Sequence, residues 1–145
     1  MKYLLLILIL PVFTGCSNQA DKTGNQSNKN TGSAAFVFQE EFHNFGSLQA
    51  GEIVAYSFRI KNTGTGKLKI LNAKVDCGCI TVEYPKKEII QGDSAYVDVI
   101  FSSAGETGNV YKEILIITNA GNKKNAKLAI AAHVKNESIN IYSAN

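Results

Sequence analysis

The sequence predicts an all-β protein whose folded part is a single antiparallel β-sandwich of about seven strands. Three observations lead to this prediction. Apolar and polar residues alternate in several short segments, which is the period of a strand buried on one face. Turn signals rich in Gly and Asn separate these segments at intervals of about 8–15 residues. No window of about twelve residues shows a helical period.

The expected strands follow from this alternation in chain order. The first is rich in phenylalanine and is interrupted by an irregularity near Glu40 and Glu41. In the second, Tyr56 and Phe58 belong to the side that should face the core. Later strands end at Pro85 or at Asn- and Gly-containing turns, as in residues 62–66 and 119–122. The expected strands span residues 36–45, 54–61, 68–75, 80–84, 95–101, 110–118 and 128–134.

Residues 1–15 have the features of a lipoprotein signal peptide. A positive start at Lys2 is followed by an aliphatic run that is too short to span a membrane and then by Phe13-Thr14-Gly15-Cys16. This last segment resembles a bacterial lipobox, whose cysteine becomes the acylated first residue of the mature protein. Phe13 departs from the usual leucine of that motif. We therefore predict lipid attachment at Cys16, which holds the chain on a membrane because several acyl chains anchor stably.

The segment after the anchor is predicted to be a disordered tether, so the chain divides into a signal (1–15), a lipidated cysteine and polar linker (16–35) and a domain (36–145). Residues 17–35 contain no Val, Ile, Leu or aromatic side chain whose burial could offset the entropy of ordering. Ser17 follows Cys16, where an inner-membrane retention signal would have Asp. We expect an outer-membrane lipoprotein that faces the periplasm.

The charge of the chain argues against nucleic acid as a partner. Its formal net charge is +3, and the lysines are scattered along the sequence instead of forming a basic stripe. Arg59 is the single arginine, which also disfavours phosphate recognition. The expected partners are the membrane, through the lipid, and another envelope protein; the sequence names no small-molecule ligand.

Several motifs in the domain resemble a known bacterial family. Residues 45–52 are similar to the opening of immunoglobulin-like domains of the ASPM, SPD-2 and hydin group, and residues 56–64 resemble the strand and turn that follow in them. Cys77-Gly78-Cys79 narrows the resemblance to the family of domain of unknown function 1573, over residues 36 to 135. Gln91-Gly92 stands where members of that family usually have Pro-Gly, so Gln91 departs from the family pattern. The resemblance implies an immunoglobulin-like sandwich, but it implies no biochemical role.

Cys77 and Cys79 are the candidate residues for chemistry. With Cys16 lipidated, they form an even pair in an oxidising compartment, which suggests a disulfide. In an extended strand their Cα atoms would lie about 6.6 Å apart with parallel side chains, so a bridge requires a bend, which we expect Gly78 to permit. A bridge formed this way is expected to be strained and easily reduced.

Three interpretations of the cysteine pair stay open. The thiols are structural and partly buried near a bulge, or they form a redox couple or strained disulfide, or they bind Cu(I), which suits two soft thiolates. Zinc is disfavoured because structural sites use four ligands. His43 and His133 could contribute, but we expect structural or solvent-exposed roles for both. The structural interpretation is favoured, because Asp76 should raise the pKa of the neighbouring Cys77 thiol.

No other pattern points to catalysis. The sequence has no nucleophile elbow, zinc-binding helix motif or phosphate-binding loop. Glu40 and Glu41 are adjacent on an expected strand and would point to opposite faces, so they could not act as a carboxylate pair. The sequence thus predicts a non-enzymatic, cofactor-free, lipid-anchored binding or assembly module, with a thiol-redox or Cu(I)-handling protein using Cys77 and Cys79 as the alternative.

Overall fold

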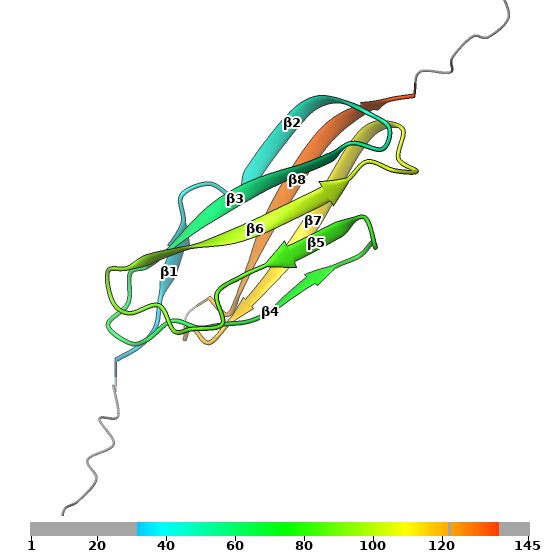
Figure 1. Ribbon diagram of the computed structural model, residues 1–145. Coiled ribbons are helices and arrows are strands. Elements are labelled where there is room, and N and C mark those ends of the chain that lie inside the picture. Colours follow the sequence, from blue (N-terminus) through cyan, green and yellow to red (C-terminus); the bar gives the residue numbers. More distant parts are fainter. Residues whose placement is uncertain (1–31, 122, 137–145) are drawn as a thin grey trace, which may run out of the picture.

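The computed structural model describes residues 32–121 and 123–136, which form a β-sandwich (Figure 1). Cys16, the signal peptide and most of the predicted linker lie outside these residues. Within them no helix is long and apolar enough to cross a membrane. The elements are β1 (Phe36–Phe38), β2 (Phe42–Gln49), β3 (Ile53–Asn62), β4 (Ile70–Val75), β5 (Ile80–Glu83), β6 (Ser94–Ser102), β7 (Gly108–Thr118) and β8 (Asn125–Lys135).

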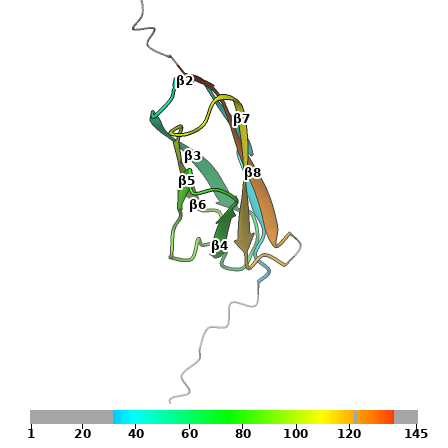
Figure 2. The same ribbon diagram turned by 90° about the vertical axis from the view of Figure 1, so that its right-hand side faces the viewer.

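Two four-stranded sheets make up the sandwich and are seen edge-on in Figure 2. The first sheet has the order β1-β3-β6-β5 and the second has the order β2-β8-β7-β4. The predicted all-β sandwich is confirmed, with eight strands in place of about seven. Neighbouring strands are antiparallel except β2 and β8, which run parallel. The predicted antiparallel pairing therefore holds for every neighbouring pair of strands except that one.

The extra strand arises because the chain changes sheets inside the first predicted strand. Residues 39–41 leave the first sheet after β1 and enter the second sheet at β2. The Gln39 N–H donates to the Arg59 carbonyl of β3 (3.0 Å), and the Glu41 carbonyl accepts from the Ala129 N–H of β8 (2.8 Å). The irregularity predicted at Glu40 and Glu41 is therefore a crossover, and these two residues do not lie on a strand as expected.

The inward sides of both sheets form one apolar core. Phe58 and Phe101 of the first sheet and Leu128 of the second have no exposed surface. Phe58 thus faces the core, as the alternation of its strand predicts. Burial of these side chains is the main stabilising term of the fold, at about 1.5–3 kcal/mol for each.

Asn62 is a buried polar residue that organises one end of the sandwich. Its amide donates to the carbonyls of Gly66 and Ile89, both at 2.8 Å, and its Oδ1 accepts from the Gly64 N–H at 2.9 Å. The turn that it shapes also binds the chain before β1, since Thr65 N–H donates to the Ser33 carbonyl at 3.1 Å. A Cβ on Gly64 would lie 2.3 Å from that carbonyl oxygen, so glycine is required there. The folded domain therefore begins before Phe36.

Candidate functional site

The candidate site lies where the chain crosses from the second sheet back to the first. β4 and β5 are edge strands of different sheets on one side of the sandwich, and residues 76–79 connect them (Figure 1). The Ser102 N–H of β6 donates to the Cys79 carbonyl at 2.9 Å, which attaches the end of this connection to the first sheet. The connection carries both cysteines of the Cys-Gly-Cys motif.

Cys77 and Cys79 are joined by a disulfide. Their Cα atoms are 5.3 Å apart, less than the roughly 6.6 Å of an extended strand, so the chain bends as the bridge requires. Gly78 does not adopt the left-handed conformation, and a Cβ at this position would meet no atom within 4 Å. The bend therefore does not depend on the left-handed conformation that glycine favours. Both cysteines are half-buried and pack against the edge of the core.

A hollow of about 380 Å³ lies beside the disulfide. β4 pairs with β7 only as far as the pair Val75 and Ile114, after which the chain leaves the second sheet. Residues 108–113 of β7 continue beyond this point and, in the described part of the chain, have a strand partner only on the β8 side. The hollow is lined by Asp76, Cys77, Ile80, Tyr111, Lys112 and Glu113.

The charged groups around this hollow are mostly paired. The Lys112 Nζ lies 2.7 Å from Glu106 Oε1, and this ion pair is about three-quarters shielded from solvent. Glu113 Oε2 lies 3.0 Å from Lys127 Nζ, and its hydrogen bond and charge raise the pKa of Lys127. Asp76 is exposed next to Cys77. The hollow thus combines two carboxylates and one ammonium group with the apolar side chain of Ile80 and one cysteine of the bridge.

The structure does not bring either histidine to the cysteine pair. His43 lies on β2, at the opposite edge of the second sheet, and stacks on Tyr56 with ring centroids 3.6 Å apart. His133 is exposed on β8, which confirms that it faces away from Leu128 and Ile130, and its Nδ1 lies 2.8 Å from Asn109 Oδ1. Among residues 32–121 and 123–136, no three His, Cys, Asp or Glu side chains are grouped to hold a metal ion.

The hollow beside the disulfide is a feature that the sequence does not predict. Its position depends on where β4 stops pairing with β7, and that register is a property of two strands distant in sequence. One feature of the sequence nevertheless points to this place. Tyr111 alternates with Val110, so an aromatic ring is placed on the outer face of a strand with an apolar inner face.

These features define a class of protein, an immunoglobulin-like β-sandwich with an open edge and a disulfide at the sheet crossover. The chain belongs to the family described as "Protein of unknown function (DUF1573)", whose model matches residues 36–134. Among curated proteins, none matches this sequence.

Solved structures share the fold at low identity. A protein of unknown function from Porphyromonas gingivalis W83 is similar with a TM-score of 0.62 and 19% identity, over 69% of this chain and 46% of that one. Human CEP192 PapD-like domain 7 is similar with a TM-score of 0.55 and 10% identity, over 72% and 87%. The VesB protease of Vibrio cholerae matches with a TM-score of 0.56 and 18% identity, over 70% and 32%. The chain thus spans less than half of the first and last of these proteins, and the similarity establishes the fold alone.

Proposed function

We propose that this protein is a lipid-anchored binding module of the bacterial cell envelope. It is attached through Cys16 to the outer membrane, faces the periplasm and binds another envelope protein without catalysing a reaction. The observation that carries the binding role is the open segment of β7, residues 108–113, which borders the hollow next to the disulfide. The anchor is supported by the lipobox-like segment Phe13-Thr14-Gly15-Cys16.

An extended segment of the partner fits this site best. A strand without a partner on one side offers backbone groups that an incoming strand can pair with, and pockets beside it select alternate side chains. A partner strand would continue the line of β4 along residues 108–113, next to Cys77 and Ile80. The inward-facing Lys112 and its ion pair with Glu106 disfavour indiscriminate pairing at this edge, which leaves selection to a complementary partner.

Site-specific crosslinking in intact cells tests the binding role. A photoreactive amino acid at Glu113, which lines the hollow, should trap one protein, identified by mass spectrometry. The same amino acid at Tyr96 is the matched control, because Tyr96 is 54% exposed on β6 in the other sheet. A single adduct from position 113 alone supports the proposal. No adduct, or the same set of adducts from both positions, contradicts it.

The anchor is tested separately by Cys16→Ala. This variant should no longer incorporate labelled fatty acid or partition with membranes, because the acylated thiol is absent. Cys77→Ser serves as the control and should keep the label. Retention of the lipid label by Cys16→Ala would show that the lipobox assignment is wrong, and it would leave the crosslinking result at position 113 unaffected.

Thiol–disulfide exchange is the second candidate function, favoured by the position of the bridge. A disulfide that closes a ring of three residues adds only about 1.6 kcal/mol to the free energy of unfolding by loop closure. Stabilisation of the fold is therefore a small part of what this bridge can do. Cys77 lines the hollow and Cys79 does not. A partner dithiol would attack the Cys77 sulfur and release Cys79 as a thiolate. The second partner thiol would then free Cys77, so that the partner is oxidised and the pair is reduced.

Single-cysteine variants test this exchange. Cys79→Ser leaves the Cys77 thiol beside the hollow, and Cys77→Ser leaves the Cys79 thiol away from it. The Cys77 thiol should react with a disulfide reagent about tenfold faster than the Cys79 thiol. Equal rates, or resistance of the wild-type bridge to a glutathione buffer, would exclude the exchange. Cu(I) binding requires prior reduction of the bridge, and it is tested by titrating the reduced protein and the double serine variant.

A further inference from the structure

The outer face of the second sheet carries a second cluster of side chains, separate from the disulfide. Phe42 of β2 and Tyr111 of β7 lie on either side of β8, which presents Ala129 and Ala131 between them. The two rings are stacked on each other across β8, with centroids 6.4 Å apart and planes at 22°. Ala129 is only 6% exposed although it lies on the solvent side of the sheet, whereas Phe42 and Tyr111 remain 49% and 61% exposed.

A shallow hollow of about 430 Å³ continues from Tyr111 along the same face. Its polar lining comes from Asn44 and Ser47 of β2, Asn109 of β7 and His133 of β8. A β-bulge between Asn44 and Ser47 contains Gly46, which has a φ of 75°, and a Cβ there would meet only open space. The lining contains no Lys, Arg, Asp or Glu.

The polar groups of this hollow are oriented by contacts with one another. Asn44 Oδ1 accepts from the Gly46 N–H at 2.9 Å, so the side-chain amide nitrogen of Asn44 is left as a donor. The His133 Nδ1 lies 2.8 Å from Asn109 Oδ1, which accepts a hydrogen bond from it, so His133 Nε2 is left for a ligand. The site thus offers two amide donors, an imidazole nitrogen and one hydroxyl next to an exposed aromatic ring.

We propose that this face binds an uncharged sugar chain. The C–H faces of a sugar ring pack on the electron-rich face of an aromatic ring, and its hydroxyls pair with both donors and acceptors. The absence of cationic side chains from the lining disfavours a phosphate or carboxylate ligand. A peptide strand fits poorly because β8, the floor of the site, is paired on both sides and offers no open edge. The proposal does not depend on the protein-binding function.

The test uses the full lipidated chain in nanodiscs free of sugar-based detergent. The probes are β-1,4-linked tetramers of N-acetylglucosamine and of glucose, titrated by calorimetry. At least one probe should bind saturably, and His133→Ala should weaken that binding about tenfold. His133 is the discriminating residue because it lines this hollow and not the one beside the disulfide, whereas Tyr111 borders both. Tyr111→Ala should weaken binding at least as much.

Tyr96→Ala is the matched control, because it removes a tyrosine of similar exposure from the outer face of the other sheet. This variant should bind the probe like the wild type, and circular dichroism of each variant should show an unchanged strand content. No saturable binding of either tetramer up to about 10 mM would overturn the proposal, because that limit lies well beyond millimolar affinity. Equal weakening by Tyr96→Ala and His133→Ala would overturn it as well.

Discussion

The chain passes between the two sheets five times, and two of these crossovers, on opposite sides of the sandwich, are stabilised differently. The first of this pair, residues 39–41, takes the chain from β1 to β2, and the second, residues 76–79, takes it from β4 to β5. Among the described residues, each crossover leaves part of the neighbouring strand without a partner on one side. Where β1 has ended, this is the early part of β3, and where β4 has ended, it is residues 108–113 of β7.

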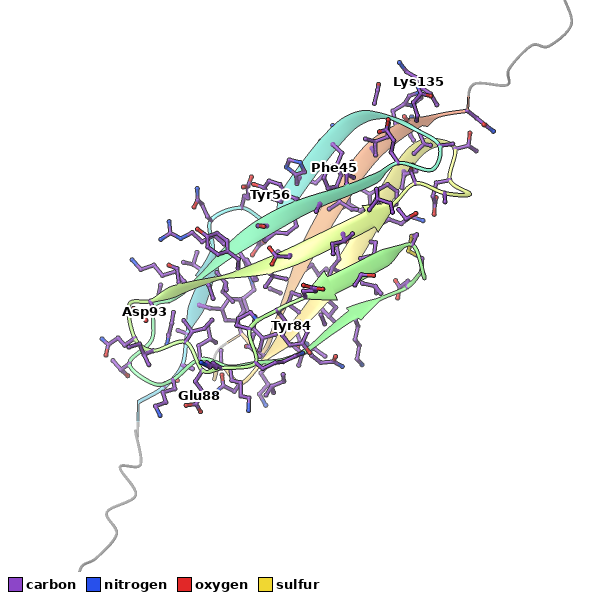
Figure 3. All side chains as sticks on the ribbon, in the orientation of Figure 1. Phe45, Tyr56, Tyr84, Glu88, Asp93 and Lys135 are labelled. Atoms are coloured by element: carbon purple, nitrogen blue, oxygen red, sulfur yellow. A yellow bond between two sulfur atoms is a disulfide. The ribbon has the colours of Figure 1, made fainter. Side chains whose placement is uncertain are left out.

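The first crossover is closed by packing. The ring of His43 stacks on Tyr56 at 8° between planes, and Phe45 and Phe58 meet these two rings edge to face. Figure 3 shows Phe45 and Tyr56 on β2 and β3 at this edge. The Tyr56 hydroxyl donates to Glu40 in the crossover itself. Side chains thus fill the gap that the departing chain leaves.

The second crossover stays open. No comparable aromatic stack joins β4 and β5 in the described part of the chain; a disulfide fixes the turn, and the hollow remains beside it. A covalent ring holds a turn in shape without filling the space next to it. A change of sheet at the edge of the sandwich can therefore leave either a packed edge or an accessible one. We expect binding at the accessible edge.

The largest effect is expected for Phe58→Ala, under the packed crossover. Truncating this fully buried ring should lower the free energy of unfolding by roughly 3–5 kcal/mol, through lost transfer energy and the cavity left behind. Chemical denaturation followed by circular dichroism measures this change. Tyr96→Ala, an exposed control, should change stability by less than about 0.5 kcal/mol. A loss below about 1 kcal/mol at Phe58 would be inconsistent with its burial.

Tyr56→Ala should cost less, about 2 kcal/mol, because its ring is only half-buried although it stacks on His43. Tyr56→Phe keeps the ring and loses only the hydroxyl, so it should retain most of that stability. The same denaturation experiment compares the two variants. If Tyr56→Ala is no less stable than Tyr56→Phe, the aromatic stack does not hold the first crossover closed.

The double variant Cys77→Ser, Cys79→Ser should be destabilised by about 1.6 kcal/mol, which is the loop-closure contribution of a three-residue ring. Thermal and denaturant unfolding under oxidising conditions measure it. Reduction of the wild type should produce a similar loss, since it breaks the same bond. A loss above about 4 kcal/mol would mean that the bridge is a main structural support of the second crossover.

The smallest effect concerns the titration of Tyr56. Its hydrogen bond to Glu40 is the main cause that raises the Tyr56 pKa above the ordinary 10.0. The raised folded-state pKa stabilises the fold below pH 10, and this contribution is lost as the pH rises through the raised value. In Glu40→Gln the pKa of Tyr56 should move back toward 10.0. The measurement follows phenolate absorbance against pH, with the Tyr56→Phe protein as the reference that isolates the signal of Tyr56. An unchanged titration would show that the contact does not form in solution.

The sequence by itself determined the class of fold and most of the strands. Alternation of apolar residues depends only on which face of a strand is buried, so the pattern alone assigns Phe58 and His133 to the correct sides of their strands. The cysteine spacing was also informative, because geometry alone required a bend for a bridge between residues two apart. The family resemblance agreed with the match over residues 36–134.

Only the tertiary structure decided which strands pair and where pairing stops. The phenylalanines of β1 and β2 form one apolar pattern in the sequence, and the change of sheet between them depends on hydrogen bonds to β3 and β8. The open segment of β7 and the face that brings Phe42, Tyr111 and His133 together depend in the same way on registers between distant strands. Local patterns determine which side of a strand is buried, whereas an edge or a hollow exists only once distant strands have met.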